Sequence, residues 1–88
     1  MITSAQIRAA RAALRWSARD LASHANVSLR TIMRVEAVDG IPPTRSVTLQ
    51  ELQAILEAAG IEFIGGPNDR PGIRISNEGP RRQLGLMS

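Results

Sequence analysis

Four stretches of the chain place apolar residues at the three- and four-residue spacing of an amphipathic helix. They cover residues 4–14, 18–25, 29–37 and 49–59. In the first stretch, Ile7, Ala10 and Leu14 share one helix face. The last stretch stops at Gly60, a residue suited to the left-handed conformation that ends many helices. The pattern predicts four short helices, each with one apolar face for a common core.

Each predicted helix follows a serine or threonine that can cap its first turn. The caps are the second members of the pairs Ile2-Thr3, Trp16-Ser17, Val27-Ser28 and Val47-Thr48. Three residues after each cap stands a polar residue that can return the hydrogen bond, namely Gln6, Asp20, Thr31 and Glu51. These capping boxes set the expected helix starts.

The periodicity changes after the fourth helix. Residues 61–64 and 73–76 are short, β-branched and roughly alternating, whereas residues 65–72 between them are rich in Gly, Pro, Asn and Asp. This pattern is typical of a two-stranded hairpin. We therefore expect a helical domain at 1–60, a hairpin at 61–76 and a flexible tail at 77–88, which has no periodicity.

Composition and charge narrow the classes of function. The chain has 88 residues and no cysteine, so it can hold one small domain without disulfides or thiolate metal sites. Its net charge is +3, and six of its 11 arginines lie in residues 1–37. Clustered arginine is expected of a surface that binds phosphate groups. Because no signal peptide or membrane-spanning run is visible, we expect a cytoplasmic protein that does not contact membranes.

The second and third predicted helices are separated by only three residues, which favours the sharp turn of a helix-turn-helix. Asn26 in this turn tolerates a positive φ angle. The pattern directs Ile32 and Val35 toward the core and leaves an outward face of Leu29, Arg30, Met33 and Arg34. Arginine can bond guanine N7 and O6, and apolar groups contact thymine methyls, so this face suits the major groove of DNA.

The stretch WSARDLASHANVSLRTIMRVEA, residues 16–37, resembles the Cro and phage-repressor type of helix-turn-helix, the xenobiotic-response-element-like family of bacterial transcriptional regulators. The resemblance covers residues 4–60. It implies a compact helical domain that binds operator DNA as a homodimer, and a buried ion pair between Arg11 and Glu36. By position, it implies DNA contacts from Ser17, Arg19, Ser28, Leu29, Arg30, Thr31, Met33 and Arg34.

Two features of the chain depart from the family pattern. The family often has glutamine where this chain has Ala18, so Arg19 or the amides of that helix start would contact the DNA backbone. The family commonly ends in a fifth helix, and here the hairpin stands in its place.

The hairpin is the expected site of dimerisation. Its apolar residues exceed what one face of a two-stranded ribbon can bury, and they are Ile61, Phe63, Ile64, Ile73 and Ile75. We expect the strands of two chains to combine across a two-fold axis. The alternative is that the hairpin packs onto the helices at 4–14 and 49–59 of its own chain.

We expect a mainly α protein, a repressor-like four-helix DNA-binding domain followed by a β-hairpin, that regulates transcription on double-stranded DNA without a cofactor. The alternative is a protein-interaction module, such as an antitoxin, that binds a partner through the acidic helix at 49–59 and the hairpin. Neither catalysis nor metal binding is expected, because His24 is the only histidine and the serines serve as caps. Arg81 and Arg82 are expected to be solvated, and the alternative is that they form a weak DNA-binding extension.

Overall fold

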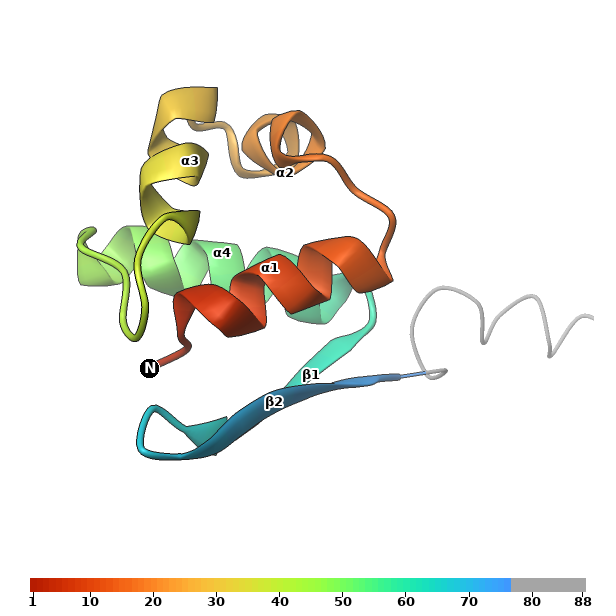
Figure 1. The fold of residues 1–88 in the computed structure, drawn as a ribbon. Helices are drawn as coiled ribbons and strands as arrows, with labels where there is room; N and C mark the ends of the chain where they lie inside the picture. The colour runs from red at the N-terminus through yellow and green to blue at the C-terminus, as the bar shows by residue number, and fades with distance from the viewer. Residues whose placement is uncertain (77–88) are drawn as a thin grey trace, which may run out of the picture.

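The computed structural model describes residues 1–76, and these form four helices followed by a two-stranded antiparallel sheet (Figure 1). The elements are α1 (Ser4–Ala13), α2 (Ala18–Ala25), α3 (Leu29–Glu36), α4 (Ser46–Ala58), β1 (Ile61–Gly66) and β2 (Asp69–Ile75). The expectation of a mainly α chain with a C-terminal hairpin is therefore confirmed. The predicted tail, with Arg81 and Arg82, lies outside the described residues.

The elements are arranged in three tiers. Figure 1 shows α1 and α4 across the middle, α2 and α3 on one side of them and the hairpin on the other. Strand β1 contacts α4, and β2 contacts α1. The buried core is aliphatic and consists of Ile2, Ile7, Ala10, Leu21, Ala22, Ile32, Val35, Leu49, Leu52, Leu56 and Ile61. The hairpin thus shares the core of the helices.

Three of the four predicted caps are present. Thr3 forms a reciprocal capping box with Gln6 at the start of α1, and Ser17 forms one with Asp20 at the start of α2. Ser28 caps α3 by accepting a hydrogen bond from the backbone N–H of residue 31. The box at α3 is incomplete, because the Thr31 hydroxyl lies 3.0 Å from the Ser28 hydroxyl and does not return a bond to its backbone.

The fourth predicted cap was wrong. Helix α4 begins at Ser46, so Thr48 lies within its first turn, and the N-cap is Arg45, which makes no side-chain capping bond. The earlier start lets the N–H of Leu49 donate to the carbonyl of Arg45 at 3.0 Å. A helix starting at Leu49 would leave that donor to solvent. The other three helices end within one residue of their predicted ends.

The hairpin is longer than predicted. Gly66 pairs with Asp69, so only residues 67–68 form the turn, and the second strand ends at Ile75. Six of the eight residues of the predicted loop lie within the strands. The register shifts between Ile64 and Gly66, where Gly65 adopts a φ of 76°. An irregularity of this kind lets a ladder continue past an extra residue.

The hairpin's apolar residues differ in how far they are buried within the chain. Ile61 is 2% exposed and belongs to the core of its own chain, and Phe63 and Ile73 pack against that core. Ile61 is buried because β1 begins only three residues after α4 ends, so its first side chain still lies against the core that α4 covers. The hairpin packs onto α1 and α4 of its own chain, as in the alternative expectation. Ile64 remains half-buried and Ile75 remains 59% exposed.

Candidate nucleic-acid interface

The turn between α2 and α3 has the backbone that the sequence predicts. Asn26 is left-handed, with a φ of 57°, and ends α2. The N–H of Val27 then donates to the carbonyl of Ala22 at 3.0 Å. Ala22 is 5% exposed and belongs to the core, so a larger side chain there would displace its neighbours. This short turn places the start of α3 directly beside the end of α2.

Helix α3 has one buried and one exposed face. Ile32 and Val35 are at most 1% exposed and pack in the core. On the opposite face, Arg30, Met33 and Arg34 are exposed, and Met33 keeps 60% of its surface accessible. The two other α3 residues predicted to contact DNA, Leu29 and Thr31, are half-buried. The buried face fixes which side chains the helix presents to a partner.

The C-terminal end of α3 is tied to α1 by an ion pair. Arg11 Nε donates to Glu36 Oε2 at 2.9 Å and Nη2 donates to Oε1 at 3.0 Å, while Nη1 donates to the carbonyl of Trp16 at 3.0 Å. This hydrogen bonding to Glu36 raises the pKa of Arg11. The two side chains are 24% and 10% exposed, so the pair is partly rather than fully buried, because the guanidinium lies at the rim of the core.

Two further side chains of α1 support the same end of α3. The Ser4 hydroxyl donates to the carbonyl of Val35 at 2.6 Å, and Arg8 donates to the backbone carbonyl of Glu36. These contacts occupy carbonyls that the last turn of a helix leaves without intrahelical partners. Helix α3 is therefore anchored at one end and along its inner face, and its outer face is left open.

Ser17 and Arg19, which were predicted to contact the DNA backbone, lie together at the start of α2, and both are exposed. The Ser17 N–H donates to Asp20 Oδ2 at 2.8 Å, and its hydroxyl accepts from the Asp20 N–H at 2.9 Å. Hydrogen bonding to the Ser17 N–H has the largest effect in lowering the pKa of Asp20, and hydrogen bonding to the Ser17 hydroxyl lowers it further.

The ring of His24, expected to be a solvated side chain, stacks on Trp16 at a centroid distance of 4.0 Å. This contact joins the last turn of α2 to the segment that precedes the helix.

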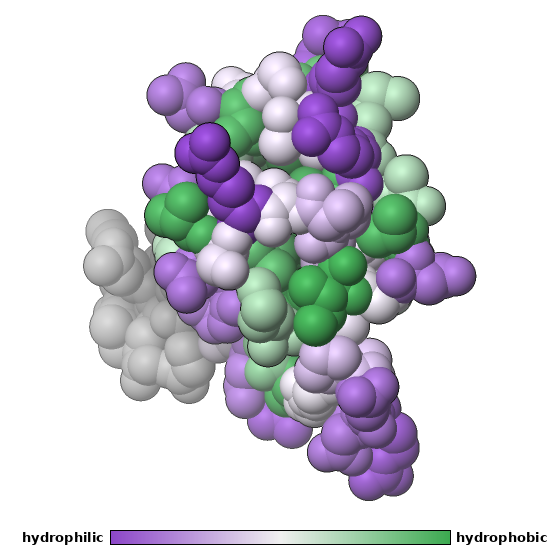
Figure 2. All heavy atoms as spheres, turned by 90° about the vertical axis from the view of Figure 1, so that its left-hand side faces the viewer, coloured by the Kyte–Doolittle hydropathy of each residue, from purple (hydrophilic) through white to green (hydrophobic). Residues whose placement is uncertain are grey.

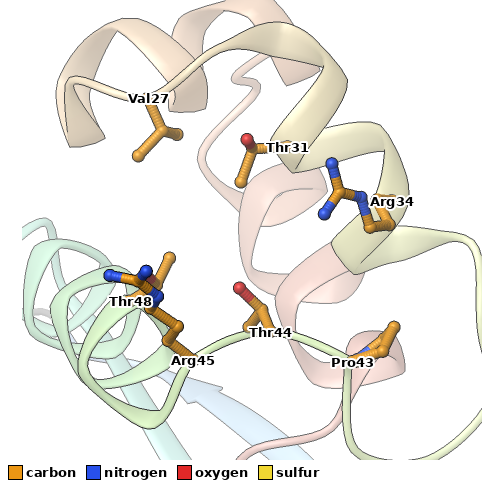
Figure 3. Close-up of a pocket in the computed structure, with 7 residues that line it drawn as sticks. All are labelled: Val27, Thr31, Arg34, Pro43, Thr44, Arg45 and Thr48. Atoms are coloured by element: carbon orange, nitrogen blue, oxygen red, sulfur yellow. The ribbon is translucent and has the colours of Figure 1, made fainter.

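An open groove of about 650 Å³, called here the α3–α4 groove, lies between α3 and the start of α4. It is lined by Val27, Thr31, Arg34, Pro43, Thr44, Arg45 and Thr48. In Figure 3, Arg34 extends from α3 over the space between Thr31 and Thr44, and Arg45 reaches alongside Thr48 from the opposite wall. Thr31 and Arg34 were predicted to contact DNA.

The other five lining residues were not among the predicted site residues. Arg45 is the charged residue of the groove that the sequence analysis did not find. The sequence shows an arginine close after two prolines, near a helix start, but it does not indicate that this segment lies beside α3. Figure 2 views the molecule from the α3 side and shows hydrophilic side chains around the surface, with hydrophobic ones between them.

The exposed arginines on this side are without acidic partners. Within residues 1–76, the ion pairs are Arg11 with Glu36 and Arg74 with Glu62. Neither pair involves Arg19, Arg30, Arg34 or Arg45. Their guanidinium groups are therefore open to an external anion.

Comparison of the chain with protein-family models, with curated proteins and with solved structures found no match. In the described part of the chain, no cluster of three His, Cys, Asp or Glu side chains is placed to hold a metal ion. None of the helices in residues 1–76 has the length and apolar character needed to cross a membrane.

Proposed function

We propose that the chain is a helix-turn-helix transcriptional regulator that binds specific sequences of double-stranded DNA with α3 in the major groove. The observation that carries this proposal is the outer face of α3, where unpaired arginines flank an exposed methionine. The fully buried Ile32 and Val35 hold that face outward. A rigid helix with free guanidinium and apolar groups matches the donor, acceptor and methyl pattern of base edges.

The side chains divide by the chemistry they can perform. Arg30 can donate two hydrogen bonds to guanine N7 and O6, whereas Met33 and Leu29 can contact thymine methyls. Ser17, Arg19, Ser28 and Thr31 lie at the first turns of α2 and α3, where backbone amides and hydroxyls suit DNA phosphates. Arg34 can contact either a base or a phosphate.

The proposal includes a homodimer. Ile75 is 59% exposed at the end of β2, and the two-stranded sheet leaves an unpaired edge on each strand. Unpaired edges are templates for adding a strand from another chain. A two-fold dimer would direct its two copies of α3 to half-sites about 34 Å apart, one turn of DNA.

Selection of bound duplexes from a random-sequence library tests the proposed function. The wild-type chain is expected to enrich one motif, and Arg30→Ala is expected to lose preference at one base pair, a change of about 1–3 kcal/mol. Arg74→Ala is the control, because it removes an arginine from the hairpin that already pairs with Glu62. Absence of any enriched motif would contradict sequence-specific binding.

A further inference from the structure

The α3–α4 groove has the donor set of a phosphate site. Two guanidinium groups from different elements, Arg34 and Arg45, line it together with the hydroxyls of Thr31, Thr44 and Thr48. No carboxylate is among the lining residues. Guanidinium groups bind phosphate oxygens through charged, directional hydrogen bonds, and hydroxyls add neutral ones.

We propose that this groove holds a phosphate of the DNA backbone, so that Arg34 is a positioning residue and Arg30 reads the bases. The inference rests on the proposed function. It follows from the position of Arg34, whose side chain extends toward Thr31 along the α3 wall of the groove and faces the wall formed by Pro43 and Thr44 (Figure 3). A phosphate held between α3 and α4 sets how deeply and at what angle α3 meets the base edges.

The apolar part of the lining favours a phosphodiester over a free phosphate ion. Val27 and Pro43 contribute carbon surface to a groove of about 650 Å³, far more room than one phosphate group needs. Deoxyribose carbons on either side of a backbone phosphate can contact this apolar surface. A bare inorganic ion would leave it exposed to water.

The first test compares the dependence of DNA affinity on salt among Arg34→Gln, Arg45→Gln and the control Arg74→Gln, each of which removes one positive charge. Each groove variant is expected to lower the slope of log affinity against log salt by about 0.9, the value for one phosphate contact. The motif selected from a random library is expected to stay the same. Arg74→Gln is expected to keep the wild-type slope.

Two results of this test would overturn the inference. One is a changed base preference at one position in Arg34→Gln, which would make Arg34 a base reader. The other is a wild-type slope in both groove variants. Both arginines are exposed, and the melting temperature of each variant verifies that it folds.

A second test uses inorganic phosphate and needs no DNA. NMR spectra are recorded with phosphate or with chloride at equal ionic strength. The arginine side-chain signals of Arg34 and Arg45 are expected to shift with phosphate only, and the double variant is expected to lose the effect at backbone amides 44–48. Equal shifts at all exposed arginines would contradict a site in the groove. If the wild-type chain binds no DNA, the proposed function fails, and this test still decides whether the groove binds phosphate.

The two tests together distinguish the sources of the phosphate. A backbone site predicts that added DNA shifts the same signals and that phosphate competes with DNA. If phosphate saturates the groove while DNA stays bound with an unchanged salt slope, the groove takes a free phosphate group and the assignment to DNA is wrong.

Discussion

Arg11 joins α1 to the end of α3 and to the segment ahead of α2. Its three nitrogen atoms reach the carboxylate of Glu36 at the end of α3 and the carbonyl of Trp16 ahead of α2. The exposed ion pair between Arg74 and Glu62, at 3.3 Å, joins only the two strands of the hairpin. The pair of Arg11 with Glu36 is therefore expected to stabilise the fold more than the pair of Arg74 with Glu62, because partial burial and bidentate geometry strengthen it.

Glu36→Ala is expected to lower the free energy of unfolding by about 2–3 kcal/mol, because it removes two charged hydrogen bonds and leaves a half-buried guanidinium without its partner. Thermal unfolding should show a fall in Tm on the order of 10 °C. Glu62→Ala is the matched control and should change stability by less than about 0.5 kcal/mol. Arg11→Met with Glu36→Leu should be closer to wild type than the single variant. Equal melting temperatures for Glu36→Ala and Glu62→Ala would show that the pair of Arg11 with Glu36 adds no stability.

Asp20 makes the start of α2 sensitive to acid. The Ser17 N–H and hydroxyl hold the pKa of Asp20 below its ordinary value of 3.8. Because the folded pKa is lowered, the capping interaction stabilises the fold above pH 3.8 and is lost as the pH falls through the folded pKa.

We expect the stability difference between the wild type and Asp20→Asn to be full at neutral pH and to shrink as the pH falls below 3.8. Melting temperatures of both proteins across that range measure the difference. A difference that is independent of pH would mean that the Asp20 charge does not act in the cap.

At the level of single residues, the sequence predicts three of the four caps, because a cap joins residues that are three positions apart. The pair of Arg11 with Glu36 was expected from the family resemblance alone, and the contacts of Ser4 and Arg8 with the end of α3 were not predicted. The sequence does not predict Arg45. The place of that side chain in the α3–α4 groove depends on the path of residues 37–45, which have no periodic pattern and bring the chain back beside α3.

The hairpin is the element whose shape departs most from its sequence pattern. Glycine and proline between 65 and 72 indicate a loop, yet six of these eight residues lie within the two strands. At the tip, Gly65 has a φ of 76°, and a Cβ there would lie 2.5 Å from the backbone carbonyl oxygens of Asp69 and Arg70. Gly66, one residue later, has open space in the same position. The first glycine is thus required and the second is not.

Gly65→Ala should therefore destabilise the hairpin by roughly 1–3 kcal/mol, since both the backbone conformation and the space are unsuited to a side chain. Gly66→Ala should be nearly neutral. Amide hydrogen exchange of the strand residues, together with Tm, measures the effect. If the two variants exchange alike, the register shift at Gly65 does not hold the turn.

Gln6 links the hairpin to the helices as well as capping α1. Its side-chain nitrogen donates to the carbonyls of Ile64 at 3.0 Å and Gly72 at 2.8 Å, while its oxygen accepts from the Thr3 N–H. The sequence predicts the cap, because the two residues are three apart. It does not predict the bonds to the strands, which join residues about 60 positions apart and exist only once the chain has folded.

On the scale of the whole molecule, the arrangement places the arginines of α3 and the exposed end of the hairpin on different parts of the surface. Three of the five hairpin residues predicted for dimerisation are used within the chain. The remaining surface, Ile64 and Ile75, is smaller than the sequence predicts. A dimer formed there must rely on strand edges as well as on side-chain burial.

Light scattering of the full chain at high micromolar concentration tests the dimer without DNA. We expect a dimer for the wild type and a monomer for Ile75→Asp, which places a charge on an exposed side chain without disturbing the core. The melting temperature of the dilute variant serves as the control for folding. A wild-type chain that stays monomeric would contradict assembly through the hairpin.

The four helices and their common core were predictable from the chain because their apolar residues follow one period and the caps of the first three helices are local. How the hairpin closes on the core was left open between two arrangements, because its alternation gives two apolar faces and does not say which one is covered. The structure places Ile61 in the core and leaves Ile75 exposed, and the direct connection from α4 explains this choice.

Methylation interference on a selected DNA site tests the placement of α3 in the major groove. Methylation of guanine N7 blocks contacts in that groove only. We predict that methylated guanines within the site prevent binding of the wild-type chain, and that Arg30→Ala becomes insensitive to one of them while Arg34→Gln keeps the full pattern. Binding that is indifferent to every methylated guanine would contradict the placement of α3 in the major groove.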